Sequence, residues 1–366
     1  MELNYTLNFA SNSEVAKKLV DMSIDVTMAS LSEDFGQTGL VSKFSLDNRH
    51  EASRMAKEGV LSFAAEKAGI EKIETKSDVI MAFANPIFEN IVNAIQAETL
   101  MGVMARVQSA QILGMANIAT VDIGDSYTWE IDPKGLPIAQ RASYLSNVTV
   151  DQSFLKKSIT VTPQQYSLGT TLDYVRVLAN DYDWGKQLAR VAMGMLYAQY
   201  KLIVSLLFDV SGTPIYKGTF AVKDYVKMAS DLNALNGGAG VTAYGTLPAW
   251  QAINAVATSG GFTTIDEYIR NNFLQKIFGI DSMIIDQATD FSAPLTGVSP
   301  TVLVPEDHIV LLSSVGDKPV KLVRENFIRV IKSDHTSTSQ NKVSYSYFMA
   351  FDAALATQAH FGLQHA

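Results

Sequence analysis

Apolar residues recur at spacings of three and four in two stretches near the start of the chain. This pattern predicts helices over residues 14–28, capped by Ser13, and over residues 51–68, ended by Gly69. Both helices carry few large apolar side chains, and short helices of this kind are marginal alone. We therefore expect residues 1–84 to form a helical arm that is held by a neighbouring copy of the chain.

The middle of the chain changes to the alternation that is typical of strands. Apolar and polar residues alternate over residues 121–131 and again over 147–150, on either side of a stretch rich in Pro and Gly. We interpret residues 123–157 as a long β-hairpin with little apolar bulk of its own. Because an isolated two-stranded hairpin is marginal in water, it needs another surface. A neighbouring subunit is the favoured surface, and a flap over its own domain is the alternative.

The large side chains of this hairpin are the candidates for contacts between subunits. Aromatic and aliphatic anchors dominate the energy of most protein interfaces. The candidates are Tyr127, Trp129, Leu136, Ile138 and Tyr144. Packing of these residues on their own chain is the alternative interpretation.

The strongest helical pattern covers residues 183–209. It follows Asp183, a good N-terminal residue for a helix, and it ends before Pro214. Between residues 191 and 208 the only charged side chain is that of Lys201. A helix so long and so poor in charge is expected to be packed on most of its circumference.

The remaining segments complete a mixed pattern of helices and strands. A strand over residues 158–162 and a helix over 168–179 precede the long helix, and a strand over 343–351 closes the chain. Residues 214–335 read as a mixed α/β unit. Its predicted helices are residues 223–235, 250–257 and 265–278, and its predicted strands are 282–285, 301–304, 309–312 and 320–323.

Composition narrows the classes of function. The chain of 366 residues has a formal net charge of -8 and no run of Lys and Arg, which argues against a protein that grips nucleic acid directly. Charged residues make up 18% of the chain, below the ~25% of an average domain, which favours large contacts between subunits over a lean monomer surface. The absence of cysteine excludes disulfides and thiolate metal sites. Neither a signal peptide nor a membrane span is recognisable.

No motif of an active site is apparent. The five histidines lack the spacing of a helical metal pair, and the glycines of residues 237–240 lack the Lys-Ser/Thr pair of a phosphate loop. The carboxylates are scattered and are better explained as helix caps and loop residues. We therefore predict a protein that is not an enzyme and needs no metal and no cofactor.

The order of these elements resembles the major capsid protein family of tailed bacteriophages, whose fold is shared with encapsulin shell proteins. The resemblance is carried by residues 123–157 as the extended loop, 183–209 as the spine helix and 242–323 as the axial domain. Within the last, Val304-Pro305-Glu306-Asp307-His308-Ile309-Val310 followed by Gly316-Asp317-Lys318-Pro319-Val320 is similar to the strand-turn-strand near that domain's end.

The resemblance implies an α+β fold with an N-terminal arm, an extended β-hairpin loop, a peripheral domain with a long spine helix, and an α/β axial domain. The implied divisions are an arm at 1–84, a peripheral domain at 85–122, 158–213 and 336–366, the loop at 123–157, and the axial domain at 214–335.

The function implied by the resemblance is that of a structural major capsid protein. It would self-assemble into hexamers and pentamers of an icosahedral phage head that encloses double-stranded DNA without sequence-specific binding. The implied location is the virion capsid, after assembly in the bacterial host cytoplasm, with scaffold, portal or decoration proteins as further partners and no membrane. The alternatives are an encapsulin-like compartment shell and a soluble α+β hydrolase with residues 123–157 as its flap.

Overall fold

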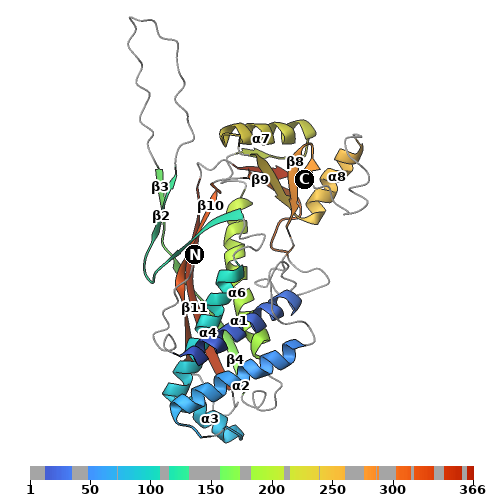
Figure 1. Ribbon diagram of the computed structural model, residues 1–366. Coiled ribbons are helices and arrows are strands. Elements are labelled where there is room, and N and C mark those ends of the chain that lie inside the picture. Colours follow the sequence, from blue (N-terminus) through green and yellow to red (C-terminus); the bar gives the residue numbers. More distant parts are fainter. Residues whose placement is uncertain are drawn as a thin grey trace, which may run out of the picture.

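The computed structural model describes residues 13–34, 48–71, 73–107, 115–131, 157–173, 183–209, 215–238, 240–259, 276–285, 287, 302–314, 317–333, 342–356 and 361–366. Its strands form a four-stranded sheet, a six-stranded sheet and a two-stranded ribbon, and its helices pack on the two larger sheets. The α+β class predicted from the sequence is confirmed. Figure 1 shows the six-stranded sheet with its helices at one end of the molecule and the remaining helices along the four-stranded sheet.

The N-terminal helices belong to the interior of their own chain. They are α1 (Glu14–Asp34), α2 (Arg49–Ala68), α3 (Lys76–Ala84) and α4 (Pro86–Arg106). Apolar residues of α1 and α2 join the main core. Glycines make this possible: a Cβ on Gly59 would lie 2.6 Å from Leu19, and Gly102 and Gly185 give α1 equally close approaches. The expectation that a neighbouring copy holds these helices is therefore wrong. The helices have few large apolar side chains, but they come close enough to one another at the glycines to pack within their own chain.

The four-stranded sheet has the order β1-β10-β11-β4. β1 (Ala116–Val121) runs parallel to β10 (Val320–Ser333), which pairs antiparallel with β11 (Lys342–Leu355), and β11 pairs antiparallel with β4 (Gln164–Asp173). Helices α4 and α6 cover one face of this sheet. Across that face the hydroxyl of Tyr347, which is 2% exposed, donates to Gln96 Oε1 at 2.9 Å. We call this sheet with α1–α4 and α6 the large unit.

The predicted spine helix is present as α6 (Trp184–Leu207). Asp183 caps it, since its Oδ1 accepts from the Lys186 amide at 2.9 Å. The buried residues of this helix form one broad stripe, and Lys201 lies outside it and is exposed. The low charge of this segment thus reflects contacts with α1 on one side and with the sheet on the other.

The six-stranded sheet has the order β5-β12-β9-β6-β8-β7 and forms what we call the small unit. Its helices α7 (Val222–Leu235) and α8 (Leu247–Ser259) cover a separate core that contains Tyr225 and Trp250. Alternate residues of the central strand β9 divide between the two cores. The strands are β5 (Ile215–Lys217), β6 (Val241–Gly245), β7 (Lys276–Ile277), β8 (Ile280–Ile284), β9 (His308–Ser313) and β12 (Gly362–His365).

Sheet pairing assigns three segments differently from the sequence pattern. Residues 168–173 are strand rather than helix, because β4 pairs with β11 along its whole length and Gly169, Thr170 and Thr171 disfavour a helix. β10 belongs to the four-stranded sheet although we expected 320–335 in the axial unit. β12 joins the six-stranded sheet although we expected it in the peripheral unit. The predicted helix at 265–278 lies outside the described residues except for its end, where β7 is a strand followed by a turn.

Candidate assembly surface

A short antiparallel ribbon leaves the edge of the large unit. It consists of β2 (Tyr127–Ile131) and β3 (Lys157–Val161), with Tyr127 opposite Val161 and Ile131 opposite Lys157. The chain therefore departs and returns at one point, which confirms the hairpin at its base. The partner strand lies later than predicted, and residues 147–150 lie outside the described residues. Figure 1 shows the ribbon beside β10, away from the small unit.

Two small apolar clusters hold the ribbon to the sheet. Val161 packs with Ala119 of β1 and Val323 of β10, and Trp129 and Ile159 lie against this group. Ile131 packs with Ala356 just beyond β11. These contacts are thin compared with the main core, since they comprise mostly Ala and Val side chains. The base is attached to its own chain, but the attachment is limited to one face of two short strands.

A buried lysine of the four-stranded sheet contacts the ribbon. Lys321 of β10 is 1% exposed, and its ammonium group pairs with the carboxylate of Asp317. The same carboxylate accepts a hydrogen bond from Asn117 Nδ2 of β1 at 2.6 Å. The Lys321 Nζ also lies 5.0 Å from the centre of the Trp129 ring, a cation–π contact. One charged group therefore ties β1, β10 and the ribbon together.

The structure separates the two described candidates for subunit contacts. Trp129 is half-buried on its own chain, as the alternative interpretation allowed. Tyr127 is 39% exposed, and its ring rests edge-on against Trp129 with 4.7 Å between the centroids. Of the two, Tyr127 is the side chain that another molecule can reach. Leu136, Ile138 and Tyr144 lie outside the described residues, so their role at an interface remains a prediction.

Two further exposed apolar residues border the ribbon, and the sequence analysis missed them. Ile123 is 64% exposed and Phe327 is 40% exposed. The pairing of Val121 with Glu325 brings the turn that holds Ile123 next to an irregularity in β10 that holds Phe327. The Gly124 amide donates to Glu325 Oε1 at 2.9 Å and fixes this turn. A bulge that turns an apolar side chain outward has no signal in simple alternation.

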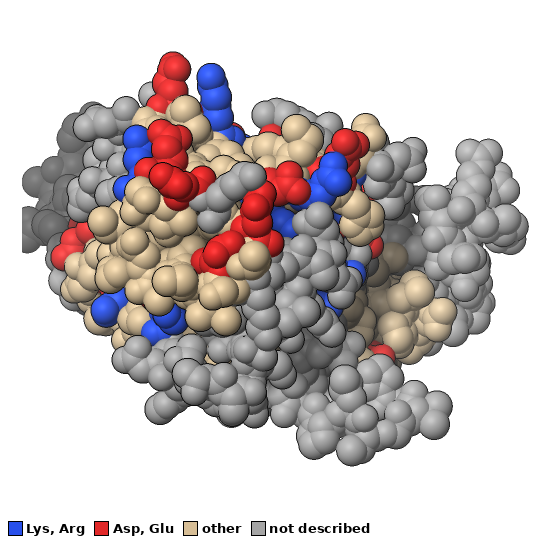
Figure 2. Space-filling model, turned by 90° about the horizontal axis from the view of Figure 1, so that it is seen from below, with Lys and Arg blue, Asp and Glu red and all other residues tan. Residues whose placement is uncertain are grey.

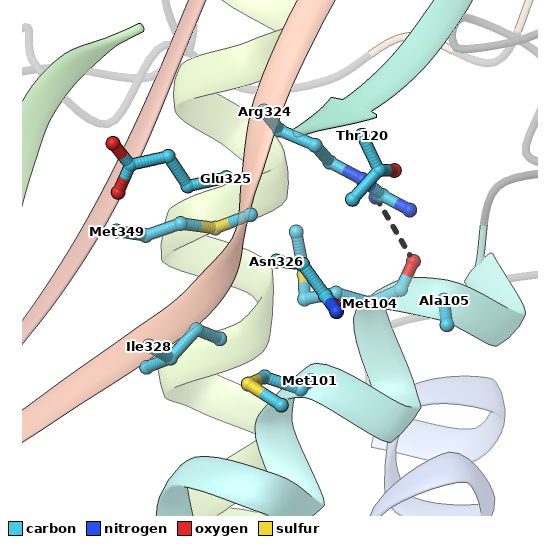
Figure 3. Close-up of a pocket in the computed structure, with 9 residues that line it drawn as sticks. All are labelled: Met101, Met104, Ala105, Thr120, Arg324, Glu325, Asn326, Ile328 and Met349. Atoms are coloured by element: carbon cyan, nitrogen blue, oxygen red, sulfur yellow. Dashed lines mark hydrogen bonds between the residues drawn. The ribbon is translucent and has the colours of Figure 1, made fainter. Parts of the chain in front are cut away.

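A small cavity lies beside the same bulge (Figure 3). Its volume is about 20 Å³, room for about one water molecule, whereas ligand pockets measure some 300–1,000 Å³. Arg324 extends along it and donates from Nη1 to the Met104 carbonyl at 3.2 Å, so this guanidinium caps the end of α4. The lining residues are Met101, Met104, Ala105, Thr120, Arg324, Glu325, Asn326, Ile328 and Met349. They include one hydroxyl and no histidine, which describes a packing gap rather than a catalytic pocket.

Two polar clusters elsewhere contain side chains of the types that act in catalysis. Ser53 donates to Asp183 Oδ1 at 2.6 Å and accepts from the Gly185 amide at 3.1 Å, so its hydroxyl is committed to the start of α6. His50 Nδ1 lies 3.2 Å from the other oxygen of Asp183 and not against the serine. This arrangement lacks the contact between nucleophile and base that catalysis needs. It fastens α2 to α6 instead.

The second cluster joins β9 to β12. His308 and His365 are paired across these strands with ring centroids 4.9 Å apart, although they are distant in sequence. Asp307 Oδ1 lies 2.6 Å from His308 Nδ1; burial opposes ionisation, but this bond and the nearby imidazoles leave the pKa of Asp307 below its usual value. Within the described ranges no three His, Cys, Asp or Glu side chains are grouped closely enough to hold a metal ion.

The described part of the face in Figure 2 has no basic groove. Acidic side chains gather there in a broad group, and the basic ones are scattered among them. At the same end, α3 and the start of α4 expose Ile80, Met81 and Ile87. In the described part of the chain, no helix is both long enough and apolar enough to cross a bilayer. This face does not have the features of a surface that grips DNA.

Comparison with known proteins finds likeness in structure alone. No protein-family model and no curated protein matches the chain. Similar solved structures include the capsid of a native GTA particle, with 13% identity, a TM-score of 0.45, and coverage of 72% of this chain and 90% of that chain. The satellite phage P4 procapsid has 14% identity and a TM-score of 0.44, over 73% of this chain and 90% of that one.

A third similar structure is the virus-like particle from Pyrococcus furiosus, with 8% identity and a TM-score of 0.41 over 74% of this chain and 97% of that one. The structural neighbours thus include capsid chains of several phages and of GTA particles, and the archaeal virus-like particle. Since these TM-scores lie below 0.5, the likenesses carry no functional argument, which has to come from the residues of this chain.

Proposed function

We propose that this chain is the structural subunit of a closed protein shell, namely the major capsid protein of a tailed bacteriophage head. The observation that supports this most directly is the ribbon base. Ile131 and Lys157 pair where the hairpin leaves the large unit, and the residues between them must return to that point. The sequence of residues 132–156 is too poor in apolar bulk for a core of its own, so a surface of another copy is its natural partner.

The arrangement of the two units and the ribbon suits a subunit whose role is to present contact surfaces to its neighbours. In the large unit, α6 packs against α1, α2 and the sheet, and the ribbon and the small unit lie at the margins of this unit (Figure 1). Each copy can then offer several weak contacts at fixed angles. Weak contacts repeated around a closed shell multiply in strength through effective concentration. Hexamers and pentamers in an icosahedral arrangement are the form of closure that we propose.

The proposed role needs no catalysis by the subunit. The two polar clusters are committed to fastening elements, and the described cavity holds about one water. A net charge of -8 suits an enclosure for double-stranded DNA that must not adhere to its wall. We place the protein in the virion capsid, assembled in the bacterial cytoplasm with scaffold, portal or decoration proteins as further partners.

An encapsulin-like compartment is the second candidate, because it has the same fold and the same mode of assembly. The two functions differ in what the shell contains. Nuclease-resistant DNA in purified particles supports the phage head, and a packaged protein supports the compartment. A soluble hydrolase has no such support in the described residues, where neither histidine cluster contacts a free nucleophile.

Replacement of residues 136–144 by a short Gly-Ser turn tests the proposal. The subunit is expected to keep its circular dichroism and its urea midpoint, because the described cores do not include this segment. Particles are expected to be absent from electron micrographs. The matched control is the conservative triple variant Leu136→Met, Ile138→Val and Tyr144→Phe, which retains apolar bulk and should still assemble. Normal particles from the Gly-Ser variant contradict the proposal.

A further inference from the structure

β4 forms one edge of the four-stranded sheet in the described part of the chain. Its ten residues pair with β11 on one side without interruption, from Gln164 opposite Phe351 to Asp173 opposite Lys342. No described strand pairs with its other side. A Cβ at Gly169 would meet only the Tyr345 carbonyl oxygen, at 4.0 Å, so the exposed face of β4 is uncrowded there. β4 thus presents a row of backbone donors and acceptors without a described partner.

This edge lacks the devices that usually block strand addition. Natural edge strands carry Lys, Pro or a bulge, or they are very short. Residues 164–172 contain no charged residue and no proline, and the register with β11 shows no bulge. The edge is also longer than those of the six-stranded sheet, which end in β5 and β7. A long edge strand without charged residues, proline or a bulge can pair with another strand.

The two faces of β4 define what kind of strand fits beside it. Tyr166 and Leu168 lie on the covered face, where Tyr166 stacks on Phe351 at 4.1 Å and Leu168 reaches the α6 glycine Gly194. Both are only half-buried. The other face shows Gln165, Ser167, Gly169 and Thr171, which are exposed. A fitting strand therefore needs apolar side chains at alternate positions and small polar side chains between them.

The first residues of the chain have this pattern. In residues 2–9, Leu3, Tyr5, Leu7 and Phe9 alternate with Glu2, Asn4, Thr6 and Asn8. A strand of this segment places all four apolar side chains on one face and all polar ones on the other. The segment is nearly as long as β4, and its one charged residue, Glu2, is at its N-terminal end. Strand addition at a sheet edge is a common mode of recognition between chains.

We propose that residues 2–9 of one copy add as a fifth strand to the outer edge of β4 in a neighbouring copy. The proposal deepens the shell function proposed above and rests on it. In this arrangement the apolar side chains of the segment cover Tyr166 and Leu168, and the polar ones continue the exposed row of β4. We assign the donor to another copy because the proposed shell requires repeated contacts between copies. Helix α1, which follows the segment, packs chiefly on helices α2, α4 and α6.

Disulfide trapping in the full chain tests this, since the natural sequence contains no cysteine. Chains with Ser167→Cys are mixed before assembly with chains that carry Asn4→Cys, Thr6→Cys or Asn8→Cys, and oxidised. At least one pair is expected to give cross-linked dimers on a denaturing gel. Leu7→Cys, whose side chain belongs to the opposite face, is the matched control and is expected to give none. Equal cross-linking by Leu7→Cys, or none by any pair, overturns the proposal.

A double-cysteine chain separates a neighbour from the same molecule. Cross-linking confined within single chains that carry Ser167→Cys with Thr6→Cys also overturns the proposal. The exchange Thr6→Leu with Leu7→Thr keeps composition but breaks alternation, and it is expected to abolish the cross-link while each subunit keeps its urea midpoint. Shells that form normally without the cross-link leave the proposed function standing and remove only this contact. Cross-linked dimers without shells support the contact and contradict the shell.

Discussion

The core around α6 and the ribbon of β2 and β3 represent two ways of stabilising a segment. Both contain regular structure, but α6 buries a broad stripe of residues within its own chain, whereas the two short strands of the ribbon are held by a few small side chains and one lysine. The difference lies in the partner. The core is complete within one molecule, and the ribbon is stabilised there only at its base. In the proposed shell, such a subunit would gain further contacts at the ribbon on assembly.

The largest expected effect on the free energy of unfolding comes from truncating a buried side chain of α6. Leu196 of α6 is fully buried, so Leu196→Ala is expected to lower the free energy of unfolding by about 2–5 kcal/mol. Leu202 of the same helix is only partly buried, and Leu202→Ala is the matched control with a smaller loss. Urea unfolding of the unassembled subunit measures both. Equal losses would mean that α6 is not packed as described.

The lysine that links core and ribbon is expected to have an intermediate effect. Lys321→Met leaves Asp317 without its cation and removes the contact with Trp129, for an expected loss of about 1–3 kcal/mol, below a fully buried pair because Asp317 is 35% exposed. A double-mutant cycle with Asp317→Asn measures the coupling. If the two losses add independently, Lys321 and Asp317 do not interact in the folded chain.

A substitution of an exposed side chain in the ribbon is expected to reduce assembly without reducing the stability of the subunit. Tyr127→Ala is expected to change the free energy of unfolding by no more than about 0.5 kcal/mol, because the ring is partly exposed and lies on the ribbon. Particle yield is expected to fall, since this aromatic side chain is available to a neighbour. Thr128→Ala, on the same strand, is the control. Unchanged yield with Tyr127→Ala would remove Tyr127 as an anchor.

The smallest expected effect is a dependence of core stability on pH. Burial raises the pKa of Glu98 in α4 from 4.5 to about 7. The folded chain therefore binds more protons than the unfolded chain between these values, so the contribution of this group falls as pH rises through that window. Glu98→Gln is expected to flatten the corresponding slope in urea midpoints between pH 5 and pH 7. An unchanged slope would show that Glu98 is solvated in the folded state.

The sequence predicted the elements with strong periodicity better than it predicted their partners. The spine helix was found within two residues at its C-terminal end, because an uncharged run flanked by Asp183 and Pro214 admits few alternatives. The docking of α1 on its own chain was not predicted, since close approach at Gly102 and Gly185 depends on which helices meet. The same limit applies to β12, whose place beside β9 is decided by tertiary pairing.

The candidate assembly surface could be predicted only in part, because local patterns do not show which elements meet in the fold. Alternation located the ribbon and its aromatic residues, but it does not tell which one faces its own sheet. The cation–π contact of Trp129 with Lys321 arises from residues far apart in sequence, and Phe327 is turned outward by a bulge. Local patterns identify segments that need a partner, and only the fold decides between partners inside and outside the chain.

The mass of the purified assembly tests the shell most directly. Native mass spectrometry or light scattering of the full chain is predicted to give closed particles in the megadalton range, many times the 39.9 kDa of one subunit. Electron micrographs of the same sample should show hollow shells of uniform size. A species between monomer and tetramer that persists at high concentration would contradict the account.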